Sequence, residues 1–506
     1  MENLKNLKAV DDKEFLISRQ KEVINYIESQ IKPSGYMKAS HNYLYYIPMW
    51  FRDSSFTSIS LTHNAKFFEK NNDKEDEEKA KDASTRLLNF MWKSVNNFSQ
   101  NMEKAINLPY EHPAFNNTML THVPARINED GKMGWHRGNN LMESDDPVDH
   151  LDFNQSLWLK QFDSVPLLII ATNEYIKNFG IDEKIGESLH KITKLLPLMI
   201  NYMNKIYVTP CSNAWEMDTN QIHAYDVAAI YSGMENALEL VKYFKKELNE
   251  EYSIKKLKKL KDILNASDIE NCLEEKNKAE IELCLKAINM ANNEKINNID
   301  ENEILKNMDN IDKFLKNHFI RNNILYKAKD VFKNDGTFKN GPVFEVDSEE
   351  IFIFTRFKPP SATKTVQNKT MEKIETDLFD GNVLPIRFLG DKYFFGGRWP
   401  LLGLEAANWY IQNNKKENAE KIINYITEKY LLNSNKIPEQ ELVNPASKDD
   451  PDKFFEKNNS NIIDDLAWSE SAYADVLSEY LKSLNLEQDE QENKKKHDLK
   501  IYKRES

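Results

Sequence analysis

Apolar residues recur at helical spacing along almost the whole chain. Residues 12–32 carry such a pattern, and Pro33 with Gly35 then end it. The same spacing predicts further helices over residues 79–98, 154–179, 185–207, 222–244, 401–412, 418–432 and 462–484. Long loops follow alternate helices, which favours antiparallel helix pairs whose connections gather at one end. No sequence repeat of fixed period is visible, so the pattern favours a closed toroid over a solenoid.

Some stretches depart from this helical pattern. Residues 343–346 and 351–354 are short apolar runs, and we predict short strands there. Residues 245–312 are rich in Lys, Glu and Asn, which is typical of a solvated helical insertion, and residues 488–506 form a charged tail. We therefore expect one all-α domain over residues 1–487, with an insertion at about 245–312 and few short strands.

The composition argues against several classes of function. The 506 residues include 81 acidic and 68 basic ones, a formal net charge of −13, so we expect no nucleic-acid partner. The three cysteines are sparse and unpatterned, which argues against a disulfide framework or a zinc site. No P-loop or dinucleotide fingerprint occurs, so we expect no cofactor. No apolar signal or membrane-spanning stretch is visible, so we expect a cytoplasmic protein without a membrane partner.

An arginine and an aspartate stand next to each other in the segment Trp50-Phe51-Arg52-Asp53. Arg52 offers a rigid fork of donors and Asp53 offers acceptors, a combination suited to holding vicinal hydroxyls. The same residues are equally compatible with a local ion pair or with a helix N-cap by Asp53. The segment alone leaves these alternatives open.

Two other loops each carry a glutamate beside an aromatic or a rigid residue. Trp215 and Glu216 end a run of loop formers, and Pro438 stiffens the approach to Glu439. Two glutamates far apart in sequence could be the acid and the base of glycoside hydrolysis. On its own, each also fits an exposed loop carboxylate, and Glu441 competes with Glu439 for the role of base.

Five short motifs now follow one another in a definite order. They are Trp50-Phe51-Arg52-Asp53, Gln161-Phe162-Asp163, Trp215-Glu216, Pro438-Glu439-Gln440 and Leu466-Ala467-Trp468-Ser469. This order resembles the catalytic domain of glucoamylase-type inverting glycoside hydrolases, a family that also contains glucodextranases and some trehalases. Each motif is short, but together they run from residue 50 to residue 469 and span most of the chain.

The resemblance implies an (α/α)6 barrel with a funnel-shaped site at one end. By that resemblance, Arg52 and Asp53 would hold the terminal sugar. Glu216 would be the general acid that protonates the glycosidic oxygen, and Glu439 the general base that activates water on the opposite face. The enzyme would then release β-glucose from the non-reducing end of short α-glucans or an α-linked disaccharide. The two carboxyl groups would lie about 6.5–9.5 Å apart to leave room for the water.

Aromatic and charged residues in the same loops are further candidates for sugar contacts, because rings stack well on sugar faces. The substrate-binding candidates are Trp50, Arg52, Asp53, Trp135, Asp163, Trp215, Arg398 and Trp468. Arg398 follows the pair Gly396-Gly397 and is alternatively an arginine at a helix start. Met217 departs from the family pattern, in which many members carry a carboxylate after the general acid. Trehalase activity, and a barrel that only binds sugars or uses phosphate, stay open as alternatives.

Overall fold

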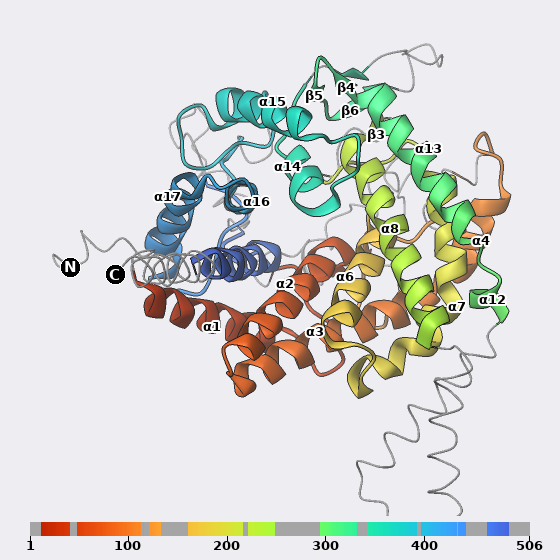
Figure 1. Cartoon of the computed structure of the whole chain (residues 1–506), viewed down its shortest axis with the longest axis horizontal. Helices are drawn as coiled ribbons and strands as arrows, with labels where there is room; N and C mark the ends of the chain where they lie inside the picture. The colour runs from red at the N-terminus through yellow and green to blue at the C-terminus, as the bar shows by residue number, and fades with distance from the viewer. Residues whose placement is uncertain are drawn as a thin grey trace, which may run out of the picture.

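The computed structural model describes residues 12–40, 48–112, 115, 121–132, 160–215, 221–247, 294–330, 342–343, 345–391, 396–432, 434–441 and 463–484. Helices dominate these residues, the strands are two or three residues long, and no sheet closes on itself. The helices surround a common centre (Figure 1). The predicted all-α toroid is confirmed.

One set of helices is buried on nearly every side and forms the inner ring. In chain order these helices are α2 (Phe51–Lys70), α6 (Ser164–Phe179), α8 (Ala224–Glu247), α14 (Glu350–Phe352) with the π-helical turn η7 (Ile353–Phe357), α16 (Pro400–Gln412) and the helix 467–484. In α2, every residue from Phe51 to Thr62 is buried. A helix that is buried all round needs no polar face, which explains the weak amphipathicity of this segment.

A second set of helices covers the first and has one polar face. These outer helices are α1 (Lys13–Gln30), α3 (Lys74–Asn96), α7 (Glu183–Ile206), α13 (Glu301–Phe319), α15 (Lys364–Ile374) with η8 (Glu375–Phe379), and α17 (Lys416–Ile426) with η10 (Thr427–Leu431). The short helices α4 (Ser99–Asn107) and α12 (Glu294–Asn297) accompany them. Side-chain N-caps start several of the outer helices: Asp12 accepts from the Phe15 amide and Asp182 from the Ile185 amide.

The structure corrects two expectations drawn from the sequence. Residues 351–354 are helical in α14 and η7, because a fully buried helix and a buried strand both read as a continuous apolar run. Helix α13 lies at the end of the stretch expected as an insertion, yet it packs on α8 and buries Ile304, Met308, Ile311, Leu315 and Phe319. The pair α8–α13 therefore belongs to the ring. Residues 248–293, and the tail at 488–506, lie outside the described residues.

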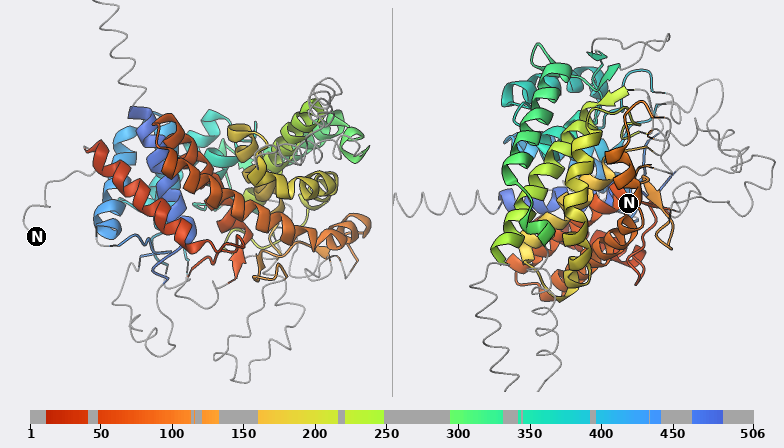
Figure 2. Two further views of the ribbon diagram at one scale, coloured as in Figure 1. Left: turned by 90° about the horizontal axis from the view of Figure 1, so that it is seen from below. Right: turned by 90° about the vertical axis from the view of Figure 1, so that its right-hand side faces the viewer.

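Short strand pairs fix the loops at one end of the ring. Strand β1 (Met49–Trp50) pairs with β2 (Arg126–Ile127) and leads directly into α2. Strand β3 (Gln221–His223) pairs with β6 (Ala328–Asp330), which also pairs with β7 (Pro342–Val343), and β4 (Ile320–Arg321) pairs with β5 (Ile324–Leu325). Figure 2 shows the β1–β2 pair at one end of the helical ring. Among the described residues, we find no helix long and apolar enough to cross a membrane.

Candidate active site

A small cavity opens where the inner helices begin, at the end of the ring that carries β1. It encloses about 60 Å³ and is lined by residues from several loops and helix starts: Trp50, Arg52, Asp53, Ala214, Trp215, Arg387, Trp399, Glu439, Leu466 and Trp468. Six residues selected from the sequence therefore meet here: Trp50, Arg52, Asp53, Trp215, Glu439 and Trp468. They come from segments up to about 400 residues apart in the chain, since residue 50 and residue 468 both line the cavity.

Arg52 is held in one orientation by partners from two other elements. Its Nη1 donates to the Ala214 carbonyl oxygen over 2.6 Å, its Nε donates to the Asp163 carboxylate, and its Nη2 donates to Gln161. Burial by itself would lower the pKa of Arg52, but the Asp163 carboxylate outweighs it and raises that pKa above its usual range. The guanidinium therefore stays charged and its position is fixed before any ligand arrives.

Asp163 has a different position from the one predicted. It is fully buried behind Arg52 and is not among the described residues that line the cavity. Its Oδ2 also accepts from the Tyr225 hydroxyl over 3.2 Å. Asp163 thus orients the arginine, while Asp53 itself lines the cavity and is 5% exposed.

The loop of Glu439 is fastened on both sides by backbone hydrogen bonds. The Glu439 amide donates to the Ile463 carbonyl over 3.0 Å, and the Leu466 amide donates to the Ile437 carbonyl over 3.0 Å. On the other side, Arg398 and Glu441 exchange two backbone hydrogen bonds of 2.8 and 2.6 Å. These bonds hold the buried Glu439 carboxylate at the cavity wall.

Glu441, the competing candidate for the base, faces elsewhere. Its carboxylate accepts from the Tyr425 hydroxyl over 2.9 Å and from the Tyr430 hydroxyl, and it lies 2.9 Å from Lys429 Nζ. It is not among the described residues that line the cavity. Of the two neighbouring glutamates, only Glu439 therefore faces this cavity.

Arg387 is a cavity residue that the sequence reasoning missed. Its guanidinium carbon lies 4.9 Å from the ring centre of Trp399 and 5.5 Å from that of Trp215. Burial works against its charge, but Asp391 pairs with it through bonds of 2.8 and 2.6 Å and raises the pKa of Arg387. The spacing Arg387-x-x-x-Asp391 was the available signal, though nothing in the sequence distinguished it from other charged pairs.

Arg398, the arginine chosen from the sequence, instead donates hydrogen bonds to backbone carbonyls. Its Nη1 donates to the Phe379 carbonyl over 3.0 Å and to the Leu384 carbonyl over 2.7 Å. It is not among the described lining residues. The carbonyls that hold its guanidinium belong to the end of η8 and the loop that follows it, away from the described lining residues.

Tryptophan rings make up much of the cavity wall. The rings of Trp215 and Trp399 lie 5.3 Å apart at an angle of 51°. Trp215 also donates from Nε1 to Asp347 Oδ1 over 2.9 Å, so the orientation of its ring is fixed. The Arg52 guanidinium lies 5.8 Å from the Trp468 ring centre. Flat apolar faces beside fixed charged groups suit a ligand with both C–H faces and hydroxyl edges.

Two of the predicted site residues belong to segments that the structure does not describe. Glu216, the candidate acid, and Trp135 lie outside the described residues, as does Met217. Trp215, the neighbour of Glu216, is the last described residue of its loop and lies at the cavity. Within the described part of the chain, no group of three or more His, Cys, Asp or Glu side chains is arranged to hold a metal ion.

Comparison with known proteins shows a likeness of structure. No protein-family model matches the sequence, and no curated protein matches it either. A solved structure titled "Glycosidase Wild Type" is similar over 93% of this chain and 99% of its own, with a TM-score of 0.60 and 16% sequence identity. A variant glycosidase in complex with glucose is similar over the same shares of the two chains, with a TM-score of 0.61 and 15% identity. At this identity the likeness shows a shared fold.

Proposed function

We propose that this protein is an inverting, exo-acting glycoside hydrolase that releases glucose from short α-glucans or an α-linked disaccharide. The observation that carries the proposal is the meeting of Arg52, Asp53 and Glu439 in one tryptophan-walled cavity next to the loop of Glu216. The similar solved structures are titled glycosidases, and one of them holds glucose, which supports the same class of reaction.

Each residue has a definite part in the proposed reaction. Arg52 and Asp53 bind hydroxyls of the terminal sugar, and the fixed orientation of Arg52 avoids an ordering cost on binding. Glu216 protonates the glycosidic oxygen, and Glu439 takes a proton from a water that attacks the anomeric carbon from the opposite face. The glycosidic bond breaks as the new C–O bond forms, so the configuration inverts.

The shape of the cavity supports removal of one terminal sugar at a time. It is small, and its wall includes the ring of Trp468, which stacks on Phe56 at a centroid distance of 5.0 Å. Phe352 lies 5.2 Å from the same tryptophan ring. The small size of the cavity and this aromatic wall support a reacting bond at the end of the substrate.

A panel of substrates tests the proposal. Maltose, isomaltose and trehalose are assayed in parallel, with and without inorganic phosphate, using the wild type and the variants Glu439→Gln and Glu441→Gln. We expect glucose release without phosphate, abolished by Glu439→Gln and retained by Glu441→Gln. Release from trehalose alone would place the protein among the trehalases, and strict dependence on phosphate would contradict hydrolysis.

A further inference from the structure

A second cavity lies within the ring, farther along the same inner helices. It encloses about 260 Å³. On α2 it begins at Phe56, one turn beyond Arg52, and continues to Ile59 and His63. One water needs about 10–15 Å³ by a comparable measure, so this space can hold a molecule much larger than water.

The two cavities share an aromatic wall and are lined by different described residues. Phe56 faces the second cavity and Trp468 faces the first, and their rings are stacked at 5.0 Å with an angle of 10° between their planes. Arg356 lies 6.0 Å from the Phe56 ring centre, on the side of the second cavity. The second cavity is therefore a separate compartment and not the inner end of the first.

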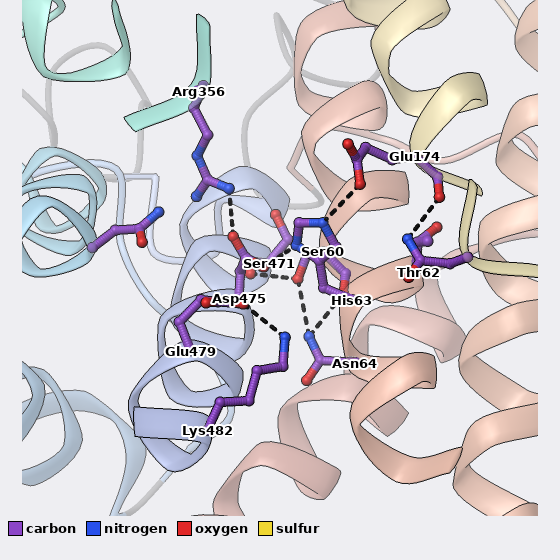
Figure 3. Close-up of polar contacts among 12 residues, drawn as sticks. Ser60, Thr62, His63, Asn64, Glu174, Arg356, Ser471, Asp475, Glu479 and Lys482 are labelled. Atoms are coloured by element: carbon purple, nitrogen blue, oxygen red, sulfur yellow. Dashed lines mark hydrogen bonds and ion pairs between the residues drawn. The ribbon is translucent and has the colours of Figure 1, made fainter. Parts of the chain in front are cut away.

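An arginine in this cavity is oriented much as Arg52 is in the first. Arg356 donates from Nε to both Glu405 oxygens, over 3.1 and 3.0 Å, and from Nη1 to Asp475 over 2.5 Å. Figure 3 shows Arg356 pointing at Asp475 on the helix 467–484. Thr355 also donates to Glu405, over 2.9 Å. The guanidinium is thus fixed by α16 and the last helix before a ligand arrives.

A histidine extends the same polar wall toward α6. His63 Nδ1 lies 2.7 Å from Asp475 Oδ1, and His63 Nε2 lies 3.4 Å from Glu174 Oε2 (Figure 3). Burial opposes the charge on the ring, but Asp475 and then Glu174 outweigh it and raise the pKa of His63 to about 9. The imidazole is therefore a charged donor at neutral pH, between two carboxylates.

Acidic and basic side chains both line the cavity. The lining residues include three bases, His63, Arg356 and Lys358, and three acids, Glu174, Asp475 and Glu479. Glu405, which is not among the described lining residues, pairs with Arg356 as well. A cation and an anion would each meet side chains of like charge in this partly buried site. Hydroxyl groups suit such a lining, because each hydroxyl group both donates and accepts.

Apolar residues line the cavity one turn away from the polar ones on the same helices, Ile59 before His63 on α2 and Ile170 before Glu174 on α6. Ile59, Leu167, Ile170 and Phe357 line it together with the face of Phe56. Polar side chains next to aliphatic and aromatic ones match a molecule with hydroxyl edges and C–H faces.

We propose that the second cavity is a binding site for a small neutral polyhydroxylated molecule, a monosaccharide or polyol. The site is held by Arg356, His63 and Glu174 against Phe56. It does not depend on the proposed hydrolysis, because its residues differ from those of the first cavity.

Equilibrium dialysis with labelled glucose tests this site by counting bound molecules per chain. We expect two for the wild type, one for Asp53→Ala, which changes the first cavity, and one for Ile170→Trp, which fills the second. Glu174→Leu removes a polar contact without adding bulk and is expected to weaken the second site at least tenfold. Glu235→Leu, at an exposed acid on α8 outside both described cavities, serves as the matched control and should bind two. Circular dichroism checks that each variant is folded.

The outcomes separate this proposal from the proposed function. Two glucose molecules bound to folded Ile170→Trp and Glu174→Leu alike would contradict the second site, whatever the protein hydrolyses. A single glucose in the wild type, lost in Asp53→Ala, would also contradict it and leave the first cavity as the sugar site. Labelled inorganic phosphate bound in the second cavity, and lost in Ile170→Trp, would contradict the choice of a neutral ligand.

Discussion

Trp215 donates its indole hydrogen to Asp347 over 2.9 Å, and this bond ties the loop that leads to Glu216 to the start of α14. Asp347 is fully buried, and its Oδ1 also accepts from the Glu349 amide over 3.0 Å. One carboxylate therefore sets both the turn at α14 and the orientation of a tryptophan at the cavity wall.

Loss of this acceptor should slow the proposed reaction. Asp347→Leu leaves the indole N–H of Trp215 without its partner, and a displacement of about 1 Å near a reacting group costs on the order of 100-fold. We expect kcat/KM for the best substrate to fall by roughly 10- to 100-fold. Asp347→Asn keeps an acceptor oxygen and should lose much less. Equal activity of the folded Leu variant and the wild type would show that the bond does not position the loop.

The pair formed by Arg52 and Asp163 predicts a large change in stability. Both side chains are buried, so Asp163→Ala leaves a charged guanidinium without its carboxylate. Removing one partner of a buried pair costs about 3–5 kcal/mol. Urea unfolding should show a loss of that order, while Glu129→Ala, in an exposed pair with Lys32, should change the unfolding free energy little. Similar effects of the two substitutions would contradict the role of Asp163.

Replacing Gly397 should disturb the loop of Glu439, the proposed base, through a steric clash. A Cβ at this position would lie 2.5 Å from the Glu441 carbonyl oxygen, so Gly397→Ala must push the Glu439 loop away. Such overpacking costs about 1–3 kcal/mol, and we expect activity to fall more than tenfold. Gly381 has a φ of +73°, which is strained for alanine, but no atom lies within 4 Å of its Cβ position. Gly381→Ala should therefore lose some stability and keep full activity, as measured by urea unfolding and initial rates.

The raised pKa of His63 should make the unfolding free energy depend on pH. Its pKa rises from the ordinary 6.5 to about 9 in the folded protein, so the folded state binds more protons between these values. The stabilisation is fully present below about pH 6.5 and is lost as the pH rises through about 9, by up to about 3 kcal/mol. His63→Gln should flatten the fall in unfolding free energy between pH 7 and pH 10. A wild type and variant with parallel profiles would contradict the assignment.

The sequence predicted the features that contiguous residues encode. Arg52 and Asp53 stand side by side at a helix start, and Glu439 follows a proline, so each could be selected from the sequence alone. The toroid followed from repeated helical pairs. Glu441 could not be separated from Glu439 in the sequence, because only the hydroxyls of Tyr425 and Tyr430 show which way its carboxylate faces.

The remaining features depend on contacts between distant segments. Arg387 reaches the first cavity because Asp391 orients it, whereas Arg398 looked more promising beside two glycines and in fact braces Phe379 and Leu384. The second cavity takes its lining residues from several helices, with only a few from each. No local pattern marks such a site, since each contribution looks like an ordinary core or surface position.

The stereochemistry of the first product tests the central claim most directly. Proton NMR follows the anomer of glucose released by the wild type in the first minutes of the reaction, before mutarotation mixes the two forms. With Glu439 activating water opposite the departing group, β-glucose should form first from an α-linked substrate. Initial release of α-glucose would contradict the two-carboxylate water mechanism proposed for this cavity.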